Sequence, residues 1–374
     1  MKVSHKAVKE ILERGVEEVI QKERLEAALL SGKKLVVKFG IDPTSPDLHL
    51  GHMVPLRKLK QFQDAGHIIA LIIGDFTATI GDPSGRSEER KPLSSTDVKH
   101  NLKKYLSLAG KIIDIKKSKI FYNSLWFKKA GMEKVIELSR ASSLQQTLRR
   151  ADFQERMKAG NDISMLELWY PLFQGYDSVM VKADVEIGGT DQKFNLLMGR
   201  RVQRHFGMSE QDIMMLPLIE GTDGARKMSK SHNNYIALDE SPENIYSKIL
   251  SVPDELIKKY FLLITDIKES DKIFTAVLLE QKKKLAKEII SLLYSKEKAE
   301  RTGETQAVVA KKGEQWIDFL TRNKFASSNS EAKRLVEGGG VDFQNIKIKN
   351  PKDVITKSGT AKIGKYKTIK IEIK

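Results

Sequence analysis

The sequence predicts an α/β protein with a parallel-sheet domain, followed by an α-helical region and a small α+β module. The first observation is the apolar run HIIALIIG at 67–74, which suits a central strand covered on both faces. The second is a shorter apolar strand at 34–39, because strand, helix and strand at these loop lengths form a right-handed βαβ unit. The third is a change to helical periodicity at Ser241 and to β-like segments after Gly340.

The amino-acid composition limits the class of protein before any motif is considered. The chain has 374 residues, too many for one ordinary domain, and its 40% apolar and 30% charged residues are typical of a globular protein. The longest apolar runs, such as 68–73, have the length of strands, so we expect no transmembrane segment and no membrane partner. The absence of cysteine excludes disulfides and thiolate metal sites, and we expect no bound metal.

The charge of the chain points to a polyanionic partner or to a solvated lysine surface. The formal net charge is +16, and the sequence pI is about 9.5. The segment 315–374 carries 13 Lys or Arg against 6 Asp or Glu, a net +7. This part of the chain is therefore disproportionately basic.

The helix between the first two strands carries two histidines in its first turn. The stretch 42–66 predicts an amphipathic helix of about 18 residues, with Asp47 as N-cap and Gly66 at the C-terminal cap. His49 and His52 are three residues apart, so both imidazoles lie on one face of the first turn. Free backbone N–H groups and the helix dipole favour an anion at that place.

Gly51 lies between the two histidines. A residue without a side chain lets a flat ring or a phosphate lie against the backbone. The spacing therefore outlines a phosphate site. The alternative is that two polar histidines stand at a fraying helix start.

The strand 67–74 is followed by a tight turn, GDPSGR at 81–86. A turn at the carboxyl end of a parallel sheet lies where open α/β folds bind ligands, although surface turns have the same composition. Residues 87–165 are mostly helical and charged, apart from a hydrophobic piece at 119–127. We interpret 87–165 as an insertion between the halves of the sheet.

The apolar segment MLELWYPLFQGYD at 165–177 predicts a helix with a polar stripe. Tyr170, Gln174 and Asp177 are four and three residues apart, which places them on one side of a core-seeking helix. Buried polar atoms need partners. The stripe is therefore either an internal hydrogen-bond network or the wall of a pocket for a polar ligand.

Two further strands end in polar loops. The strand at 184–187 runs into a glycine pair and a helix to about residue 206, the layout of a second nucleotide-facing loop. The strand at 212–219 ends in EGTDGARKMSKSHNN, which presents Lys227 and Lys230. That loop is either solvated or a mobile cationic clamp over phosphates.

The motifs together resemble a known family. HLGH at 49–52 and KMSKS at 227–231 are the two hallmarks of class I aminoacyl-tRNA synthetases, in the expected order and on the expected elements. DPTSPDLHLGH, GDPSGR, YPLFQGYD and GGTDQKFN narrow the resemblance to tyrosyl-tRNA synthetases. The segment ASSNSEAKRLVEGGGV resembles the S4-type RNA-binding domain of the bacterial enzymes.

The resemblance covers essentially the whole chain and implies a domain order. Residues 1–222 would form a Rossmann-like catalytic domain with the insertion at about 87–165. Residues 223–313 would hold the KMSKS loop and a helical anticodon-side domain, and 314–374 an S4-like RNA-binding domain. The resemblance also implies a cytoplasmic homodimer that uses L-tyrosine, tRNA(Tyr) and ATP with Mg²⁺, without a tightly bound cofactor.

Residue roles follow from the match to the family motifs. The expected catalytic residues are His49, His52, Lys227, Lys230, Thr44 and Arg86. The expected ATP-binding residues are Gly51, His49, His52, Gly189, Asp191 and Lys230. The expected tyrosine-binding residues are Lys38, Asp82, Tyr170, Gln174, Asp177 and Gln192, with Asp177 as acceptor for the phenolic proton. In the basic C-terminal part, Lys333 and Arg334 are expected to contact RNA.

One position departs from the pattern of many family members. These members have a tyrosine four residues before the Asp-Pro-Thr segment, where it touches the substrate hydroxyl, and this chain has Lys38. The lysine could pair with Asp177 or with Asp75, or turn away from the pocket.

Three rival functions share parts of this pattern. A tryptophanyl-tRNA synthetase has the same fold and both hallmarks, but the S4-like tail and Asp177 argue against it. Another HxGH nucleotidyltransferase would have no use for a basic RNA module. A non-catalytic RNA-binding protein of this fold would be expected to lose the histidines and lysines, and all four are present.

Overall fold

The structure is a computed structural model that describes residues 3–43, 47–84, 95–303, 306–364 and 367–374. It divides into two compact units, one formed by Met1–Asp239 with Pro253–Phe274 and one by Glu240–Val252 with Thr275–Lys374. Within the described ranges, no helix combines the length and the apolar character that crossing a membrane requires.

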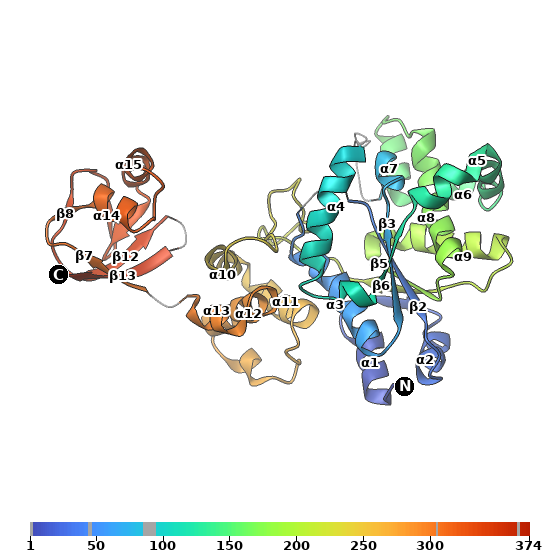
Figure 1. Cartoon of the computed structure of the whole chain (residues 1–374), viewed down its shortest axis with the longest axis horizontal. Coiled ribbons are helices and arrows are strands. Elements are labelled where there is room, and N and C mark those ends of the chain that lie inside the picture. Colours follow the sequence, from blue (N-terminus) through green and yellow to red (C-terminus); the bar gives the residue numbers. More distant parts are fainter. Residues whose placement is uncertain (1–2, 44–46, 85–94, 304–305, 365–366) are drawn as a thin grey trace. The chain divides into compact units, whose positions relative to one another are not determined.

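A six-stranded sheet forms the centre of the first unit (Figure 1). Its order is β1 (Glu18–Ile20), β6 (Asp212–Leu216), β5 (Val185–Gly189), β2 (Val36–Ile41), β3 (Ile68–Ile73) and β4 (Lys119–Tyr122). All neighbouring pairs are parallel except β1 with β6. The parallel sheet predicted from the apolar runs is confirmed.

Strand β2 lies at the point where the strand order reverses. Val37 pairs with Ile69 of β3 on one side and with Val185 of β5 on the other. The loops after β2 and β5 therefore open toward the same crevice at the carboxyl ends of the strands, where open α/β sheets bind ligands.

Helices cover both faces of the sheet. Figure 1 shows α3 (Leu50–Asp64) and α4 (Ser95–Ala109) on one side, and α8 (Met165–Val181) and α9 (Lys193–His205) on the other. Helices α1 (His5–Glu13) and α2 (Lys22–Leu30) precede β2. The capping box of Ser164 and Glu167 fixes the start of α8, because each satisfies a backbone N–H of the other.

The segment expected as an insertion contributes to the sheet. Its apolar piece divides into the edge strand β4 and the first turn of α5 (Ser124–Ser139). Helices α6 (Leu144–Thr147) and α7 (Ala151–Lys158) complete it. Strand β4 brings Asn123 and Trp126 to the carboxyl end of β3, where they become part of the site described below.

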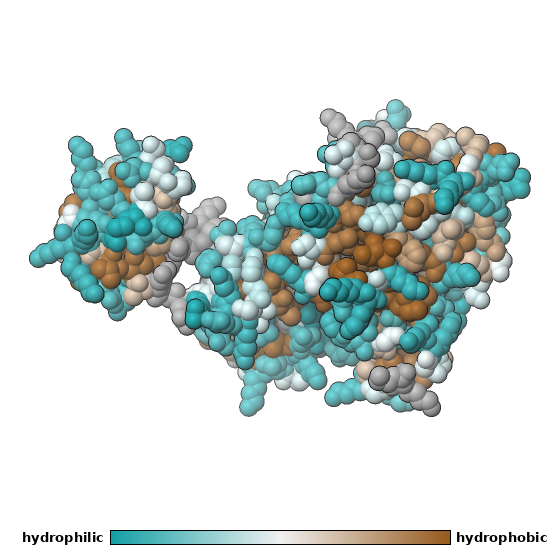
Figure 2. Space-filling model, viewed as in Figure 1, coloured by the Kyte–Doolittle hydropathy of each residue, from teal (hydrophilic) through white to brown (hydrophobic). Residues whose placement is uncertain are grey.

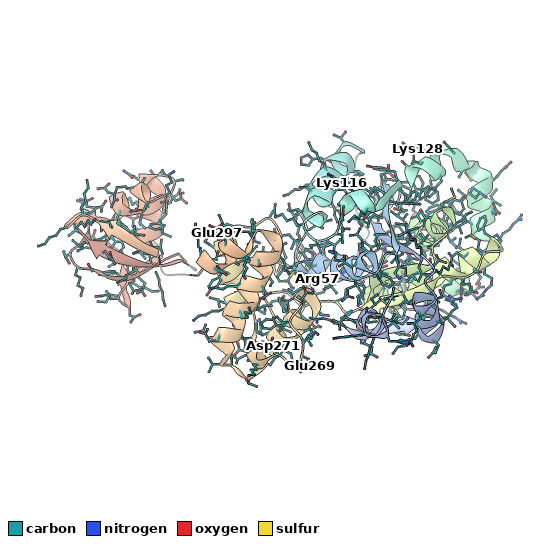
Figure 3. The ribbon with its side chains drawn as sticks, turned by 60° about the horizontal axis from the view of Figure 1, so that its bottom comes forward. Arg57, Lys116, Lys128, Glu269, Asp271 and Glu297 are labelled. Carbon is teal, nitrogen blue, oxygen red and sulfur yellow. The ribbon has the colours of Figure 1, made fainter. Side chains whose placement is uncertain are left out.

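Residues from beyond the KMSKS segment also belong to the first unit. Helix α11 (Ile257–Ile264) packs against α3. Arg57, labelled in Figure 3, extends from α3 and forms an ion pair with Asp266, just after α11. In the second unit, α10 (Pro242–Ser251) begins at the N-cap Ser241 as predicted, and α12 (Leu278–Leu293) and α13 (Lys296–Arg301) follow.

The C-terminal module has its own sheet and core. The sheet order is β10 (Ile346–Ile348), β9 (Val341–Phe343), β12 (Gly359–Ile363), β13 (Lys367–Ile373) and β7 (Gln306–Ala310). Strands β8 (Glu314–Gln315) and β11 (Val354–Ile355) form a second, smaller sheet, and α14 (Trp316–Arg322) and α15 (Asn329–Glu337) complete the module. Trp316 and Phe319 are buried in its core. Since β7 pairs with β13, this sheet reaches back before the expected boundary at residue 314.

Candidate active site

The two histidines stand at the start of α3. The helix begins at Leu50 with His49 as its N-cap, so the prediction that Asp47 is the cap is wrong. The His52 ring accepts a hydrogen bond from the His49 backbone N–H at 3.2 Å. A side chain of the first helical turn thus satisfies the backbone N–H of the N-cap residue. Asp47 instead binds two lysines, because a carboxylate gains more from charged donors than from a backbone N–H.

Both imidazoles are neutral at pH 7. Burial, with smaller effects of His52 and Lys230, lowers the pKa of His49 to about 2. Burial is the largest effect on His52 and lowers its pKa to about 4. The rings lie 4.0 Å apart between centroids. Histidines at this helix start can therefore exchange hydrogen bonds with a phosphate, while the positive charge must come from other groups.

Gly51 makes room for the His49 ring. A Cβ atom at this position would lie 2.9 Å from His49 Cε1 and Nδ1, closer than real contacts allow. His49 Nδ1 is buried and has no hydrogen-bond partner among the described residues. The glycine thus lets the imidazole lie flat against the first turn, in the orientation from which it can meet a ligand.

The stretch of chain that follows the KMSKS segment is joined to the start of α3 by backbone hydrogen bonds. Leu50 N donates to Ile236 O at 3.0 Å, and Leu238 N donates to Leu48 O at 2.8 Å. This β-like pairing brings both signature segments to one side of the crevice. The sequence placed them on separate loops, and the structure brings them together.

Both lysines of the segment contact acidic side chains from elements around the crevice. Lys230 forms an ion pair with Asp47, which also binds Lys104 of α4. Hydrogen bonds from Lys104 and Lys230 hold the pKa of Asp47 below its usual range. Lys227 Nζ lies 3.1 Å from Asp191 Oδ2, in the loop after β5. The cationic groups therefore lie next to the histidines and to the loop after β5.

Asn234 fixes the backbone of the lysine segment. This buried side chain accepts from Ser229 N at 2.9 Å and donates to the carbonyl oxygens of Arg226 and Lys227, both at 3.2 Å. It also donates to the Asp223 carboxylate at 3.0 Å. The loop is thus a folded turn with a polar centre rather than a solvated charge run.

Asp177 lies at the centre of the polar stripe of α8. Trp126 Nε1 donates to its Oδ1 at 2.9 Å, and Asn123 Nδ2 donates to its Oδ2 at 3.4 Å. Burial raises the pKa of Asp177 to about 7, against the attraction of Lys38 and the two donors. Because both oxygens accept hydrogen bonds, the ionised carboxylate is the form that this geometry satisfies.

Tyr170 is tied to the loop after β2. Its hydroxyl donates to Asp42 Oδ2 at 2.8 Å, and Thr77 Oγ1 donates to Asp42 Oδ1 at 2.8 Å. A side chain on Gly74 would collide with the Asp42 carboxylate, so this position requires glycine. Burial and the nearby Asp42 raise the pKa of Tyr170.

Asp82, in the turn after β3, and Gln192, after β5, form a second polar cluster. Gln192 Nε2 donates to Asp82 Oδ2 at 2.8 Å. The buried Asn195 of α9 donates to Gln192 Oε1 at 2.9 Å and accepts from Arg150 Nη1 at 2.7 Å. Arg150 also donates to Ser84 Oγ at 3.1 Å. A buried arginine therefore holds the turn after β3 and the loop after β5 together.

Lys38 turns away from Asp177. Its ammonium forms an ion pair with Glu186 of β5 at 2.8 Å, and Asp75 is held by the backbone N–H of Ser124 at 2.9 Å. Among the described residues, no hydrogen bond joins Lys38 to Asp177 or to Asp75. Lys38 therefore pairs with Glu186, an acid that the sequence analysis did not name, and with neither of the two that it did.

Four predicted residues are described separately from this cluster. Thr44 and Arg86 lie outside the described residues. Lys333 and Arg334 are exposed on α15 in the C-terminal module, and the Lys333 ammonium lies 3.8 Å from the Glu337 carboxylate. Over the ranges that the structure describes, no group of three or more His, Asp or Glu side chains could hold a metal ion.

The sequence analysis missed the residues that position the predicted ones. They are Asp42, Asn123, Trp126, Arg150, Glu186, Asn195 and Asn234. Two signals pointed toward them: Asn195 is part of the quoted GGTDQKFN segment, and Asn123 and Trp126 lie in the apolar piece at 119–127.

Comparison with known proteins places this site in a family. The model of the family "tRNA synthetases class I (W and Y)" matches residues 30–314. The fold and the two signature segments thus define a class I aminoacyl-tRNA synthetase. A tyrosine–tRNA ligase of Dehalococcoides mccartyi is 45% identical over 391 residues, covering 98% of each chain, and one of Aquifex aeolicus is 42% identical, covering 96% of this chain and 97% of that one. The chain belongs to the tyrosyl-tRNA synthetase family, the tyrosine–tRNA ligases.

Solved structures show the same fold. The tyrosyl-tRNA synthetase of Archaeoglobus fulgidus complexed with L-tyrosine superposes with a TM-score of 0.63 at 22% identity, covering 79% of this chain and 98% of that one. A C-terminally truncated mitochondrial tyrosyl-tRNA synthetase of Aspergillus nidulans gives 0.66 at 22% identity, covering 79% and 91%. At this identity the likeness supports the fold alone.

Proposed function

We propose that the crevice at the switch point binds L-tyrosine and ATP with Mg²⁺, forms tyrosyl-adenylate, and then transfers tyrosine to tRNA(Tyr). The observation that carries this proposal is Asp177, a buried carboxylate whose two oxygens are fixed by Trp126 and Asn123. A carboxylate held in this way can accept one further hydrogen bond, from a phenolic hydroxyl. Phenylalanine, which lacks that hydroxyl, would leave the acceptor without a partner.

The acidic and amide groups of Asp82, Gln174 and Gln192 suit the substrate ammonium. Asp82 and Gln192 are linked to each other, and Gln174 lies one helical turn before Asp177. An ammonium needs acceptors, and these residues carry carboxylate and amide oxygens. We assign the amino group of tyrosine to Asp82, Gln174 and Gln192, and the Tyr170–Asp42 pair to the wall beside it.

The histidines and lysines suit the phosphates of ATP. The tyrosine carboxylate is already a nucleophile at pH 7, so its attack on the α-phosphorus needs no general base. The reaction needs positioning and stabilisation of charge on the α-phosphate and the leaving pyrophosphate. We assign hydrogen bonding to the neutral His49 and His52, and charge to Lys227 and Lys230, which must exchange Asp191 and Asp47 for phosphate.

The remaining ATP contacts are proposed from the family motifs. Gly51, Gly189 and Asp191 border the crevice at the start of α3 and after β5. Mg²⁺ enters with ATP, bound to its phosphates. Thr44 and Arg86 are proposed to add hydrogen bonding and charge at the phosphates.

Transfer to RNA is proposed to depend on the basic C-terminal part. A terminal ribose hydroxyl of tRNA would attack the carbonyl carbon of the adenylate, and AMP would leave. Lys333 and Arg334 are exposed on a capped helix, in a segment with a net charge of +7 over 315–374. Such a surface suits a phosphate backbone. The functional division at 1–222, 223–313 and 314–374 remains a proposal.

A homodimer in the cytoplasm is proposed from the family and from exposed apolar side chains. Figure 2 shows apolar side chains at the surface of the first unit among charged ones. Large exposed apolar residues lie on two of its helices, Leu125, Met132 and Ile136 on α5 and Met165, Leu166 and Met180 on α8. Such residues on neighbouring helices mark interaction surfaces.

The decisive experiment is ATP–pyrophosphate exchange with each of the twenty amino acids. We expect strong exchange with tyrosine, and exchange with phenylalanine lower by about 100-fold or more, because a buried acceptor would lose its partner. Comparable exchange with tryptophan or phenylalanine would contradict the proposal. Exchange without transfer to tRNA would point to another nucleotidyltransferase.

A further inference from the structure

The Lys38 ammonium has no donor left for a substrate. A lysine ammonium has three N–H groups, and a buried one must satisfy all of them within the protein. Lys38 Nζ donates to the Gln174 carbonyl at 2.7 Å and to Ser178 Oγ at 2.8 Å, and it forms an ion pair with Glu186 Oε1 at 2.8 Å. The side chain is 0% exposed. Lys38 therefore cannot contact the tyrosine hydroxyl without losing one of these partners.

Glu186 is satisfied just as completely. Its Oε1 accepts from Lys38 and from Gln174 Nε2 at 3.1 Å. Its Oε2 accepts from Ser178 Oγ at 3.2 Å and from Gln211 Nε2. A carboxylate offers about four acceptor positions, and protein groups occupy all of them. The ion pair is thus a closed network that joins β2, β5, α8 and the residue before β6.

Two glycines let α8 and α9 approach closely around this network. A Cβ atom on Gly199 of α9 would lie 2.6 Å from Gln211 Nε2 and 3.0 Å from Glu186 Oε2. A Cβ atom on Gly175 of α8 would lie 2.7 Å from Val202 Cγ2. A side chain at either glycine would therefore disturb the packing around the network.

The groups held by this network belong to the polar stripe of α8. Lys38 binds the carbonyl oxygen of Gln174 and the side chain of Ser178, and Asp177 lies between these two residues along the helix. Glu186 holds the amide nitrogen of Gln174, which leaves the amide oxygen as the atom that can accept from an ammonium.

We propose that the buried Lys38–Glu186 pair is a positioning element for tyrosine recognition, which fixes Gln174 and Asp177 from behind the pocket without touching the substrate. This inference rests on the proposed function. It assigns the specificity of the pocket to Asp177 with its donors, and gives Lys38 a role that differs from the expected direct contact.

The competing explanation is an ion pair that only stabilises the fold. Replacing a buried pair by neutral side chains of similar size often leaves stability unchanged, whereas removing one partner leaves an uncompensated charge. The double replacement therefore separates the two roles. It removes the charges together, and it also removes the hydrogen bonds that hold α8.

The experiment compares Lys38→Met, Glu186→Gln and the double variant in tyrosine-dependent pyrophosphate exchange. Each rate is divided by the concentration of active sites, which is measured from the amount of adenylate that the protein forms. We expect the unfolding temperature of the double variant to lie within a few degrees of that of the original chain. Its KM for tyrosine should rise about tenfold or more, with KM for ATP changed less than about threefold, because the lost hydrogen bonds serve only the tyrosine side.

Lys58→Met is the matched control. Lys58 is a buried lysine of α3 whose ammonium donates to the carbonyl oxygens of Ile11 and Arg14, both at 2.8 Å, far along the helix from the histidines. Its loss should lower the unfolding temperature and leave KM for tyrosine unchanged. Ser178→Ala is a milder variant that removes the hydroxyl between Lys38 and Glu186, and it should raise KM for tyrosine about threefold or more.

The outcomes are distinct. An unchanged KM for tyrosine in the folded double variant and in Ser178→Ala would overturn the inference, since the pair would then be structural. A rise of similar size in Lys58→Met would overturn it as well, because any buried lysine would give the effect. Failure of the original chain to exchange with tyrosine would instead contradict the proposed function.

Discussion

Trp126 Nε1 donates a hydrogen bond to Asp177 Oδ1 at 2.9 Å, so an indole from the first turn of α5 fixes a carboxylate on α8. The donor comes from the segment expected as an insertion, and the acceptor from the polar stripe. The recognition of a phenolic hydroxyl that we propose for Asp177 therefore depends on how these two helices pack.

Replacing Trp126 by Phe removes this donor while keeping an aromatic ring. We expect KM for tyrosine in pyrophosphate exchange to rise about tenfold, with little change in KM for ATP, because one hydrogen bond to a charged group is lost. Trp169→Phe is the control, since Trp169 packs beside Phe173 in the same apolar cluster. An equal effect of both changes would show that packing, and not the hydrogen bond, is responsible.

Tyrosine binding should depend on pH through Asp177. Burial raises the pKa of this carboxyl to about 7. An ionised carboxylate is the stronger acceptor for the phenolic proton, so KM for tyrosine should fall as the pH rises from 6 to 8. Asp177→Asn should remove this dependence. A flat profile in the original chain would mean that Asp177 is ionised throughout this range.

The Asp177 carboxyl should also make the stability of the fold depend on pH. Stability should fall as the pH rises, whereas tyrosine binding should improve. A carboxyl whose folded-state pKa is raised stabilises the fold below its unfolded pKa, and this contribution is lost as the pH rises through about 7. Asp177→Asn should therefore raise the unfolding temperature, relative to the original chain, more at pH 8 than at pH 5. Thermal unfolding at the two pH values tests this sign.

Lys230 should act on the transition state of adenylate formation. Replacing it by Ala should lower the single-turnover rate by about 100-fold, with a much smaller effect on tyrosine affinity, because charge develops on the phosphates during the reaction. Lys104→Ala is the matched control, since Lys104 binds the same Asp47 carboxylate from α4. A rate loss of equal size in Lys104→Ala would show that the integrity of the Asp47 cluster, not the Lys230 charge, limits the reaction.

Removing the C-terminal module should affect only the RNA step. A chain that ends at Gly303 lacks the whole module and should form adenylate at nearly the full rate while charging tRNA poorly. The affinity of the full chain for tRNA should fall steeply with added salt. Normal charging by the shortened chain would contradict the assignment of RNA binding to this module.

The position of the cut is itself a test of the module boundary. A chain that ends at Gly313 keeps β7 without its partner β13 and leaves the buried Val308 and Ala310 uncovered. It should aggregate more readily than the chain that ends at Gly303, because an unpaired strand edge invites association. Light scattering of the two chains at equal concentration measures the difference.

The proposed dimer surface can be tested by a substitution that introduces one charged side chain. Met132 is 71% exposed on α5, so Met132→Glu should leave the fold intact. If this helix lies in the interface, the buried charge should shift the sedimentation of the protein from dimer toward monomer. Val277→Glu is the control, because Val277 is equally exposed before α12. A dimer unaffected by Met132→Glu would place the interface elsewhere.

Much of the site could be predicted because its signals are local in sequence. The two histidines lie within one helical turn, and the stripe of Tyr170, Gln174 and Asp177 follows from helical spacing alone. Strands β2, β3, β5 and β6 were predicted, whereas β1 and β4 were not predicted as strands. Strand β6 ends at Leu216 rather than at residue 219, because Pro217 cannot continue the hydrogen bonding.

The partners of these residues could not be predicted, because each comes from a distant element. Lys38 meets Glu186 only through the pairing of β2 with β5, and no local spacing reveals which acid faces which lysine. Asp47 is of a residue type that often caps helices, yet its carboxylate binds two lysines from other elements. Sequence patterns predict where polar groups lie along an element, while tertiary contacts decide what they bind.

The pairing of β2 with β5 has a consequence for the order of folding. Val37 pairs with Ile69 once the connection that holds α3 is closed, but it pairs with Val185 only after a much longer stretch of chain has been closed. Closing a longer loop costs more chain entropy, and distant contacts form late. The β2–β3 half with the histidine helix should therefore form early in refolding, and the pocket around Asp177 late. Tyrosine binding, followed during refolding, should report one of the last steps at which the sheet is completed.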